Sequence, residues 1–312
     1  MIKKAMIMAA GVGTRLNPLT LTVPKPMIPV ANVPVLEFIL KHLQSFGIND
    51  VIANTHYIAD SIHNAYGGEN HLGINFNYVY EPELSGTAGG VKKTEFFFDD
   101  NETFIVVSGD AITDVDIEKL YQKHKSSNAL ATMALKEVPM SEVEHFGVVV
   151  TDKDSRVIGF QEKPSIQEAK SNLVNTGIYM FEKEVFSHIP ANTFYDFGKQ
   201  VFPEMLRDNE RLYAHVTDDY WNDIGTIKQY KLSSFDVLNK KLKYNSGRAI
   251  GENTIIEDGA VLSGTNIIGK NCIIKAGAQV NNSIIWDNVV IDGNAKLNDC
   301  IVANIDGTMH IL

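Results

Sequence analysis

A glycine-rich turn near the amino terminus holds the residues of this chain that are best suited to chemistry. It follows a short apolar run, residues 5–9, and reads Ala10-Gly11-Val12-Gly13-Thr14-Arg15. Glycines in a turn after a strand let backbone N–H groups approach phosphate oxygens closely. Arg15 adds a fork of donors that suits a polyphosphate. The segment therefore predicts a phosphate-binding turn.

Lys25 stands between two prolines a short way beyond this turn. The rings of Pro24 and Pro26 restrict the backbone and favour an extended segment, which limits the freedom of the lysine. Two generic phosphate motifs do not fit, because Leu16 replaces the third small residue of a dinucleotide fingerprint and no Gly-Lys-Ser/Thr of a P-loop follows. A solvated surface turn is the alternative for the glycines alone. It does not explain the glycines together with Arg15 and Pro-Lys-Pro.

Two aspartates, Asp110 and Asp223, lie in segments where a strand is expected to end. Asp110 comes after Ser108-Gly109, which closes the apolar run 103–107. The second, Asp223, lies in Trp221-Asn222-Asp223-Ile224-Gly225-Thr226. Each aspartate by itself fits a turn or a helix cap as well as a functional site. Both become informative only when they are combined with the other motifs.

Taken together, these segments resemble the signature of the sugar-1-phosphate nucleotidylyltransferases, also called nucleotide-sugar pyrophosphorylases. The similarity extends through most of the chain and includes Pro29-Val30-Ala31-Asn32, Glu81 with Gly86-Thr87-Ala88-Gly89, Phe146-Gly147, Glu162-Lys163-Pro164 and Asn175-Thr176-Gly177. The resemblance implies an enzyme that transfers a nucleoside monophosphate from a nucleoside triphosphate to a sugar 1-phosphate and releases pyrophosphate.

The resemblance also implies a role for each motif. The catalytic residues would be Arg15, Lys25, Asp110 and Asp223, with the two acids holding the cofactor Mg²⁺. The nucleotide would be bound by Ala10, Gly11, Gly13, Thr14, Glu81, Gly86 and Thr87. The sugar phosphate would be bound by Gly147, Glu162, Lys163 and Asn175. Outside this family, adjacent charges such as Glu162-Lys163 are typical of a solvated face, and Trp221 is better explained as a packing residue than as a substrate contact.

The implied reaction accounts for these residue types. The sugar-phosphate oxygen attacks the α-phosphorus, and pyrophosphate leaves in line. Such a step needs positioning and charge neutralisation more than a covalent intermediate. Hard carboxylate oxygens suit Mg²⁺, which bridges reacting phosphates.

Glu81 aligns with the position at which the family reads the base. A carboxylate can accept two adjacent hydrogen bonds, which guanine offers through N1–H and N2–H₂, whereas uracil and thymine present one N–H between two carbonyls. This favours GTP, and the stretch 18–26 with the repeat tail resembles the mannose-1-phosphate guanylyltransferases. The short tail and Ser85, where Leu is more usual, depart from that branch. The alternative is a UTP- or dTTP-dependent glucose-1-phosphate nucleotidylyltransferase.

The elements that must position these residues alternate along residues 1–242. Strand-like runs at 51–54, 76–80 and 103–107 alternate with helical patterns at 34–46 and 58–66. The alternation predicts an α/β catalytic domain with a Rossmann-like, mostly parallel sheet flanked by helices, and a ligand crevice at the carboxyl ends of the strands. A helical stretch at 227–243 is expected to connect this domain to a second one, residues 247–312.

Apolar residues in the second domain recur with a period of six. They are Ile250, Ile256, Leu262, Ile268, Ile274 and Val280, followed after a short shift by Ile285, Ile291 and Leu297. The period resembles the hexapeptide repeat of a left-handed parallel β-helix, whose coils must stack to bury their apolar rows. An ordinary sheet rich in Ile and Val is the alternative. A terminal coil leaves an apolar edge, so we expect a homo-oligomer formed through the β-helix.

Composition excludes several classes of partner. The 312 residues are 44% hydrophobic and carry a net charge of −10, which allows two domains and disfavours binding to nucleic acid. No apolar run approaches the ~20 residues that span a bilayer, so no membrane partner is expected. Cys272 and Cys300 do not form a disulfide scaffold or zinc motif, and a cytoplasmic location is expected.

Two other classes of function remain as alternatives. A repeat-fold acyltransferase needs a catalytic histidine on a coil, and the sequence has none between His215 and His310. A non-catalytic regulatory or assembly subunit would be expected to have lost catalytic residues. Against it, the chain retains Arg15, Lys25, Asp110, Lys163 and Asp223.

Overall fold

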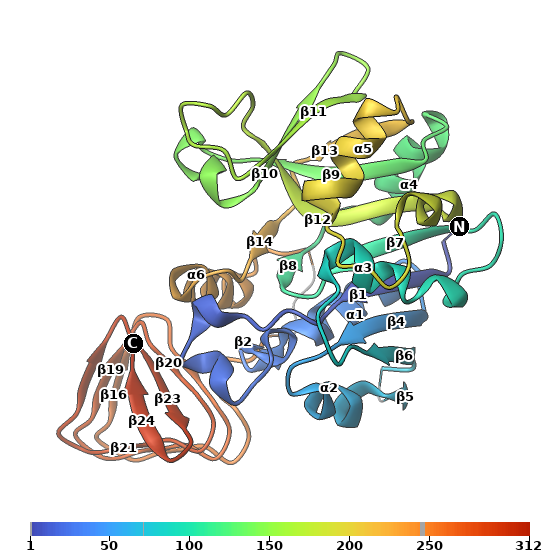
Figure 1. Ribbon diagram of the computed structural model, residues 1–312. Coiled ribbons are helices and arrows are strands. Elements are labelled where there is room, and N and C mark those ends of the chain that lie inside the picture. The colour runs from blue at the N-terminus through green and yellow to red at the C-terminus, as the bar shows by residue number, and fades with distance from the viewer. Residues whose placement is uncertain (1, 71, 244–246) are drawn as a thin grey trace. The chain divides into compact units, whose positions relative to one another are not determined.

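The computed structural model describes residues 2–70, 72–243 and 247–312 (Figure 1). The chain divides into two compact units. Unit 1 runs to Gly11 and continues with Ile39–Gly109 and Thr113–Trp221, whereas unit 2 comprises Val12–Phe38, Asp110–Ile112 and Asn222–Leu312. The segment that carries Lys25 thus belongs to the same unit as the repeats. The two domains predicted from the sequence, residues 1–242 and 247–312, remain a prediction. The two compact units are divided differently, because unit 2 also includes residues 12–38 and 110–112.

Unit 1 is built on a sheet of ten strands within the described chain. The strands are β1 (Lys4–Met8), β4 (Asp50–Thr55), β5 (Gly68–Glu69), β6 (Asn75–Tyr80), β7 (Thr103–Ser108), β9 (Ala131–Glu137), β10 (Gly147–Thr151), β11 (Val157–Glu162), β12 (Leu173–Glu182) and β13 (Leu212–Thr217). Their order is β11-β10-β12-β7-β1-β4-β6-β5, with β9 paired to β12 and β13 paired to β9. The predicted runs at 51–54, 76–80 and 103–107 coincide with β4, β6 and β7.

The centre of this sheet is parallel, as the sequence predicts. Strand β1 lies parallel between β4 and β7, and β6 lies parallel to β4. Antiparallel pairing of β12 with β7 and β9, and of β10 with β11 and β12, extends the sheet on one side. Met8 and Ser108 are in register at the ends of β1 and β7. The glycine-rich turn and Asp110 therefore follow neighbouring strand ends.

Helices accompany the strands in the predicted alternation. They are α1 (Val35–Ser45), α2 (Ala59–Tyr66), α3 (Gly86–Lys92), α4 (Ile117–Ser126) and α5 (Phe202–Arg207), with short helical turns η4 (Glu95–Phe97), η5 (Met140–His145), η6 (Lys183–His188) and η7 (Phe197–Val201). The patterns at 34–46 and 58–66 are confirmed as α1 and α2. One buried cluster joins Met6 and Val106 of the sheet to Phe181, Phe197 and Phe202. Full burial of each such large apolar side chain contributes roughly 1.5–3 kcal/mol.

The amino-terminal part of unit 2 is a chain of short turns. These are η1 (Thr14–Leu16), η2 (Leu19–Leu21) and η3 (Lys25–Met27), followed by the hairpin strands β2 (Pro29–Val30) and β3 (Val33–Pro34). Strands β8 (Ala111–Thr113) and β14 (Trp221–Asp223) pair with each other and carry the chain between the units. Helix α6 (Ile227–Leu238) follows where the sequence predicts a helix. Within the described residues, no helix has the length and apolar composition needed to cross a bilayer.

The repeats of unit 2 form three parallel sheets, the pattern of the predicted left-handed β-helix (Figure 1). Their strands are β15 (Ile255–Ile256), β16 (Val261–Ser263), β17 (Ile267–Ile268), β18 (Ile273–Ile274), β19 (Gln279–Asn281), β20 (Ile284–Ile285), β21 (Val290–Ile291), β22 (Lys296–Asn298), β23 (Ile301–Ile305) and β24 (Thr308–Ile311). The hexad positions stack in columns, for example Ile268 on Ile285 and Ile285 on Val302. Strand β24 turns back antiparallel to β23.

A column of asparagines at the turns was not anticipated from the sequence. Asn253 donates to Asn271 at 3.3 Å, and Asn271 donates to Asn288 at 3.1 Å. All three have a positive φ, between 55° and 60°. Asparagine tolerates this left-handed conformation better than most residues, so each position combines a turn with a side-chain hydrogen bond between coils.

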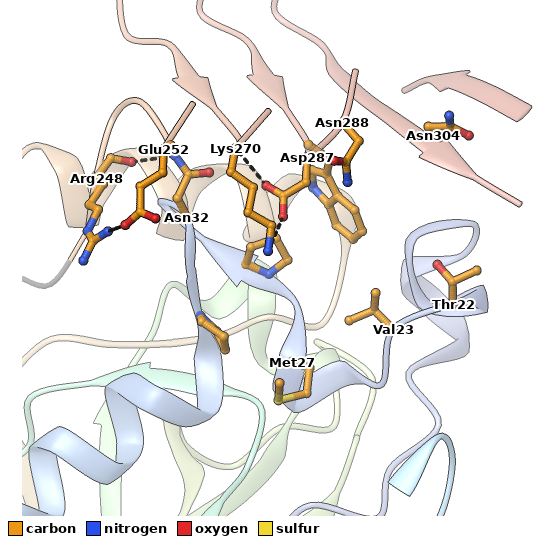
Figure 2. Close-up of a pocket in the computed structure, with 14 residues that line it drawn as sticks. Thr22, Val23, Met27, Asn32, Arg248, Glu252, Lys270, Asp287, Asn288 and Asn304 are labelled. Atoms are coloured by element: carbon orange, nitrogen blue, oxygen red, sulfur yellow. Dashed lines mark hydrogen bonds and ion pairs between the residues drawn. The ribbon is translucent and has the colours of Figure 1, made fainter. Parts of the chain in front are cut away.

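The turn-rich segment of unit 2 is anchored to the repeats of the same unit. Asn32 donates through Nδ2 to the carbonyls of Arg248 and Ile268, at 2.9 and 2.8 Å. Beside this contact, a cavity of about 430 Å³ is lined by residues such as Met27 and Lys270 (Figure 2). None of the residues predicted to bind substrate lines this cavity.

Candidate active site

The glycine-rich turn folds back onto the segment that carries Lys25. Gly13 has a φ of 73°, and a Cβ built there would lie 3.1 Å from Lys25 Cβ and from Thr20 Cγ2. Only glycine accepts both this φ and this close approach without strain. The Thr20 hydroxyl donates to the Gly13 carbonyl at 3.0 Å and fixes the turn. Thr14 and Arg15 remain exposed, where they can meet a ligand.

Lys25 forms an ion pair with Asp110. The lysine is buried, with an exposed fraction of 6%, and it lies in η3. The Asp110 carbonyl accepts a hydrogen bond of 2.9 Å from Ile224 N. This backbone contact holds the segments that carry Asp110 and Asp223 side by side.

Asp223 is held in an environment that is poor for a lone carboxylate. Its Oδ1 is buried and has no hydrogen-bond partner in the described part of the chain. Burial raises the pKa of Asp223, the charge of Asp110 raises it further, and Lys25 and Arg15 oppose the rise. The four residues predicted to be catalytic, Arg15, Lys25, Asp110 and Asp223, are thus brought together in unit 2.

This pair of acids fits a divalent cation. An orphaned buried carboxylate oxygen beside a second carboxylate is the arrangement that a hard cation stabilises. The described residues contain no group of three or more His, Cys, Asp or Glu side chains that could hold a metal. Mg²⁺ commonly uses one or two carboxylates and takes its remaining ligands from water and phosphates, so two acids suffice.

Glu81 lies in unit 1 and does not present its carboxylate to solvent. The residue is completely buried, and its Oε1 accepts a hydrogen bond of 2.6 Å from Asn54 Nδ2. Its Oε2 accepts from Lys93 Nζ at 2.9 Å and from the backbone and hydroxyl of Ser85. The carboxylate that was expected to read the base edge is therefore already engaged. The sequence analysis did not identify Asn54 and Lys93 as partners of Glu81. Only Asn54 could have been noticed, because it is a polar residue at the end of an apolar strand.

The loop after Glu81 is fixed by the segment that precedes η7. Gly86 has a φ of 79°, and a Cβ there would lie 2.4 Å from the Tyr195 carbonyl, so glycine is required. That carbonyl accepts hydrogen bonds of 3.0 Å from the N–H groups of Ala88 and Gly89. The Thr87 hydroxyl donates to Asp196 Oδ2 at 2.9 Å. The predicted nucleotide-binding loop is thereby held in one conformation.

The residues assigned to the sugar phosphate lie on adjacent strands of unit 1. Gly147 of β10 is in register with Glu162 of β11, and Lys163 follows at the strand end. Glu162 and Lys163 are exposed and form a pair at 3.5 Å. A Cβ at Gly147 would lie 2.7 Å from Phe160 Cζ, so the glycine leaves space for the Phe160 ring beside these residues.

Asn175 and Trp221 make mainly internal contacts. Asn175 donates to the Tyr179 hydroxyl at 2.8 Å and accepts from Gly177 N at 3.1 Å. Trp221 lies edge-on against Phe146, with ring centroids 5.4 Å apart, and its Nε1 donates to the carbonyl of Thr176. The predicted packing role of Trp221 is confirmed.

Comparisons with known proteins give the chain a family. The family model described as nucleotidyl transferase matches residues 4–240, and the model described as GlmU-like, C-terminal hexapeptide matches residues 239–311. A UTP–glucose-1-phosphate uridylyltransferase from Synechocystis sp. is 37% identical, over 96% of this chain and 87% of that protein. A mannose-1-phosphate guanylyltransferase from Mycobacterium tuberculosis is 31% identical, over 94% of this chain and 82% of that protein.

Solved structures support the fold. A UDP-glucose pyrophosphorylase from Acinetobacter baumanii is similar with a TM-score of 0.68 at 23% identity, over 77% of this chain and 94% of that one. The resemblance that the motifs indicate is confirmed, because both relatives are sugar-1-phosphate nucleotidyltransferases. The chain therefore belongs to the nucleotidyl transferase family and is a nucleotidyltransferase with a GlmU-like C-terminal hexapeptide region.

Proposed function

We propose that this protein transfers a nucleoside monophosphate from a nucleoside triphosphate to a sugar 1-phosphate and releases pyrophosphate. The observation that carries the proposal is the cluster of Arg15, Lys25, Asp110 and Asp223 in unit 2. Two cations and two acids beside a glycine-rich turn suit a reaction in which several phosphates must be held together. Membership of the nucleotidyl transferase family supports the same reaction.

Each member of the cluster has its own part in this reaction. Arg15 and the backbone of the turn at Gly13 bind triphosphate oxygens. Lys25 is oriented by its ion pair with Asp110, so its charge is already in place when negative charge develops at the phosphorus. Mg²⁺ held by Asp110 and Asp223 would neutralise charge on the reacting phosphates.

The sugar phosphate is assigned to residues of unit 1. Lys163 supplies a cation for the phosphate, and Glu162 accepts hydrogen bonds from sugar hydroxyls. Both side chains are exposed, and Gly147 lies opposite Glu162 on the neighbouring strand. The assignment of Asn175 to sugar-phosphate binding has less support, because its side-chain amide already forms hydrogen bonds with Tyr179 and Gly177.

The nucleotide and the sugar are the finer part of the proposal. Guanine recognition by Glu81 needs an accessible carboxylate, and this carboxylate is buried among Asn54, Ser85 and Lys93. The relative named for UTP and glucose 1-phosphate is 37% identical, and the one named for mannose 1-phosphate and guanylyl transfer is 31% identical. We therefore place UTP with glucose 1-phosphate ahead of GTP with mannose 1-phosphate.

A substrate matrix tests both levels of the proposal. Purified protein is assayed for pyrophosphate release with GTP, UTP, dTTP or ATP, each with glucose 1-phosphate or mannose 1-phosphate, in the presence and absence of Mg²⁺. We expect release that requires both substrates and Mg²⁺ and is fastest with UTP and glucose 1-phosphate. Faster turnover of GTP with mannose 1-phosphate would restore the guanine assignment. No release with any pair would reject the function.

We also propose that the protein forms a homo-oligomer through its β-helix. The first coil exposes apolar side chains, with exposed fractions of 56% for Ile255, 53% for Val261 and 36% for Leu262. Strands β15 and β16 lie at the outer edges of their sheets in the described chain, and such an edge favours association. Light scattering should give a mass above one chain, reduced by Val261→Lys. A monomeric wild type would reject this proposal.

A further inference from the structure

Asn54 connects two segments of unit 1 that precede the predicted nucleotide-binding residues. Its Oδ1 accepts a hydrogen bond of 2.9 Å from Ala9 N, at the end of the strand that leads into the glycine-rich turn. Its Nδ2 donates to Glu81 Oε1 at 2.6 Å. Asn54 is 4% exposed and Glu81 is 0% exposed. The two contacts fix which way the amide points, because one partner is a donor and the other an acceptor.

The other oxygen of Glu81 binds both ends of helix α3. Ser85 is the residue before the helix, and it donates to Oε2 through its backbone N–H at 3.2 Å and through its hydroxyl. Lys93 is the residue after the helix, and its Nζ lies 2.9 Å from the same oxygen. A single buried carboxylate thus sets the position of α3, whose first residues are Gly86 and Thr87.

Helix α3 is shaped to allow this contact. A Cβ at Gly90 would lie 2.3 Å from Asn54 Nδ2 and 2.9 Å from Glu81 Oε1. Side-chain atoms do not approach a Cβ this closely, so the hydrogen bond between Asn54 and Glu81 depends on the glycine. Any larger residue at position 90 would therefore displace Asn54 or Glu81 and break their hydrogen bond.

The network keeps Glu81 ionised in spite of its burial. Burial alone would raise the pKa of the carboxyl group, but hydrogen bonds from Ser85, Lys93 and Asn54 outweigh it and lower the pKa below its ordinary value. Each group that contacts the carboxylate is a donor. A glutamine of the same shape has one acceptor oxygen and would turn its NH₂ group towards a donor.

We infer that Glu81 is a positioning residue, which holds the loop Ser85–Gly89 and, through Asn54, the strand end at Ala9 in place for the nucleotide, and that it does not read the base. The inference rests on the proposed function for its kinetic readout. A base-reading carboxylate must offer its oxygens to the ligand, whereas here both oxygens are used inside the protein. The role of Glu81 is therefore the same for every nucleoside triphosphate.

The first experiment compares base preference in the full-length protein. Glu81→Gln is assayed with GTP, UTP and dTTP beside Glu83→Gln, a control at an exposed position of the same segment. We expect kcat/KM of Glu81→Gln to fall by roughly 10–100-fold for every nucleotide, with the ratios between nucleotides kept within about threefold. The control should behave like wild type. A selective loss with GTP, or a reversal of preference, would overturn the inference.

A second experiment exchanges donor and acceptor within the network. Asn54→Asp alone sets a second carboxylate against Glu81 and should be as harmful as Glu81→Gln. In the double variant, the glutamine NH₂ donates to the aspartate, its carbonyl accepts from Ser85 and Lys93, and the aspartate still accepts from Ala9 N. We expect the double variant to recover at least about tenfold in kcat/KM over Glu81→Gln. If the double variant has the same thermal unfolding midpoint as the wild type but no gain in kcat/KM over Glu81→Gln, the inference is overturned.

Nucleotide binding separates this inference from the proposed function. If the wild type releases no pyrophosphate with any substrate pair, the proposed reaction fails. Calorimetric titration of UTP and of GTP into the wild type, Glu81→Gln and the double variant then decides the role of Glu81. Parallel weakening and joint recovery for both nucleotides would support the positioning role. A change in preference, or a wild type that binds neither nucleotide, would overturn it.

Discussion

Lys25 and Asp110 form an ion pair across 85 positions of sequence. The lysine is buried between two prolines, and the aspartate follows the end of a central strand. Such a pair is organised before any substrate arrives, because the groups on both sides are held by the fold. Electrostatic stabilisation of this kind costs no reorganisation during the reaction.

Lys25→Met should lower kcat by roughly 10²–10³-fold and change KM for the nucleotide much less, because the cation acts where charge develops in the transition state. Steady-state kinetics with the best substrate pair measures this split. Lys153→Met, at an exposed turn position, is the matched control. A variant whose kcat is within threefold of wild type would show that Lys25 has no part in the chemistry.

Asp223→Asn should abolish activity and yet stabilise the fold in the absence of metal. The substitution removes a buried carboxylate whose Oδ1 has no hydrogen-bond partner among the described residues and whose charge repels that of Asp110. We expect the free energy of unfolding in EDTA to rise by about 1 kcal/mol and the Mg²⁺-dependent gain in stability to disappear. Urea unfolding with and without Mg²⁺ measures both. Asp218→Asn, at an exposed position, should leave both unchanged.

Lys163→Ala and Glu162→Gln should raise KM for the sugar 1-phosphate by about tenfold and leave KM for the nucleotide unchanged. Both side chains are exposed and make few internal contacts, so the fold should not change. Initial-rate kinetics with each substrate varied in turn checks the separation. Lys170→Ala, exposed on the same loop, is the control. An equal rise of KM for both substrates would argue against the assignment.

The stability of the protein should fall below pH 6.5 because of His124. Burial lowers the pKa of His124 to about 4, and the neighbouring Glu182 opposes this only in part. The unfolded chain, with a pKa of about 6.5, takes up the proton first, so the stabilisation is complete above that pH and is lost as pH falls towards 4. Between pH 7.5 and 5.0, the wild type should lose about 2 kcal/mol more than His124→Gln in urea unfolding. Equal losses would contradict this prediction.

Asn271 tests the asparagine column of the β-helix. Asn271→Gly keeps a residue that accepts a φ of 55° but removes the hydrogen bonds to Asn253 and Asn288. Asn271→Ala removes the bonds and also strains the backbone. We expect losses of about 1 kcal/mol for the glycine variant and about 2 kcal/mol for the alanine variant. Thermal unfolding monitored by circular dichroism gives the order, and an alanine variant as stable as the glycine variant would exclude backbone strain.

The sequence by itself determined several elements of the first domain, the repeats of the second and the family of this protein. The runs that became β4 and β7 could be found because a strand buried on both faces consists of consecutive apolar residues. The run that became β6 could be found because its residues alternate in the way that a half-buried strand does. The hexad of the repeats could be found for the same reason, since its period follows directly from the coil. The motif residues could be named because their types and order along the chain resemble one family.

Only the tertiary structure decided what several of these residues contact. The base-reading assignment of Glu81 depended on an accessible carboxylate, but folding brings Asn54 and Lys93 to it, from 27 positions before and 12 after. The asparagine column likewise exists only because successive coils align residues 18 and then 17 positions apart. Hydrogen bonds between distant segments produce no repeating pattern along the sequence. They depend on which donors lie beside a buried acceptor once the chain has folded.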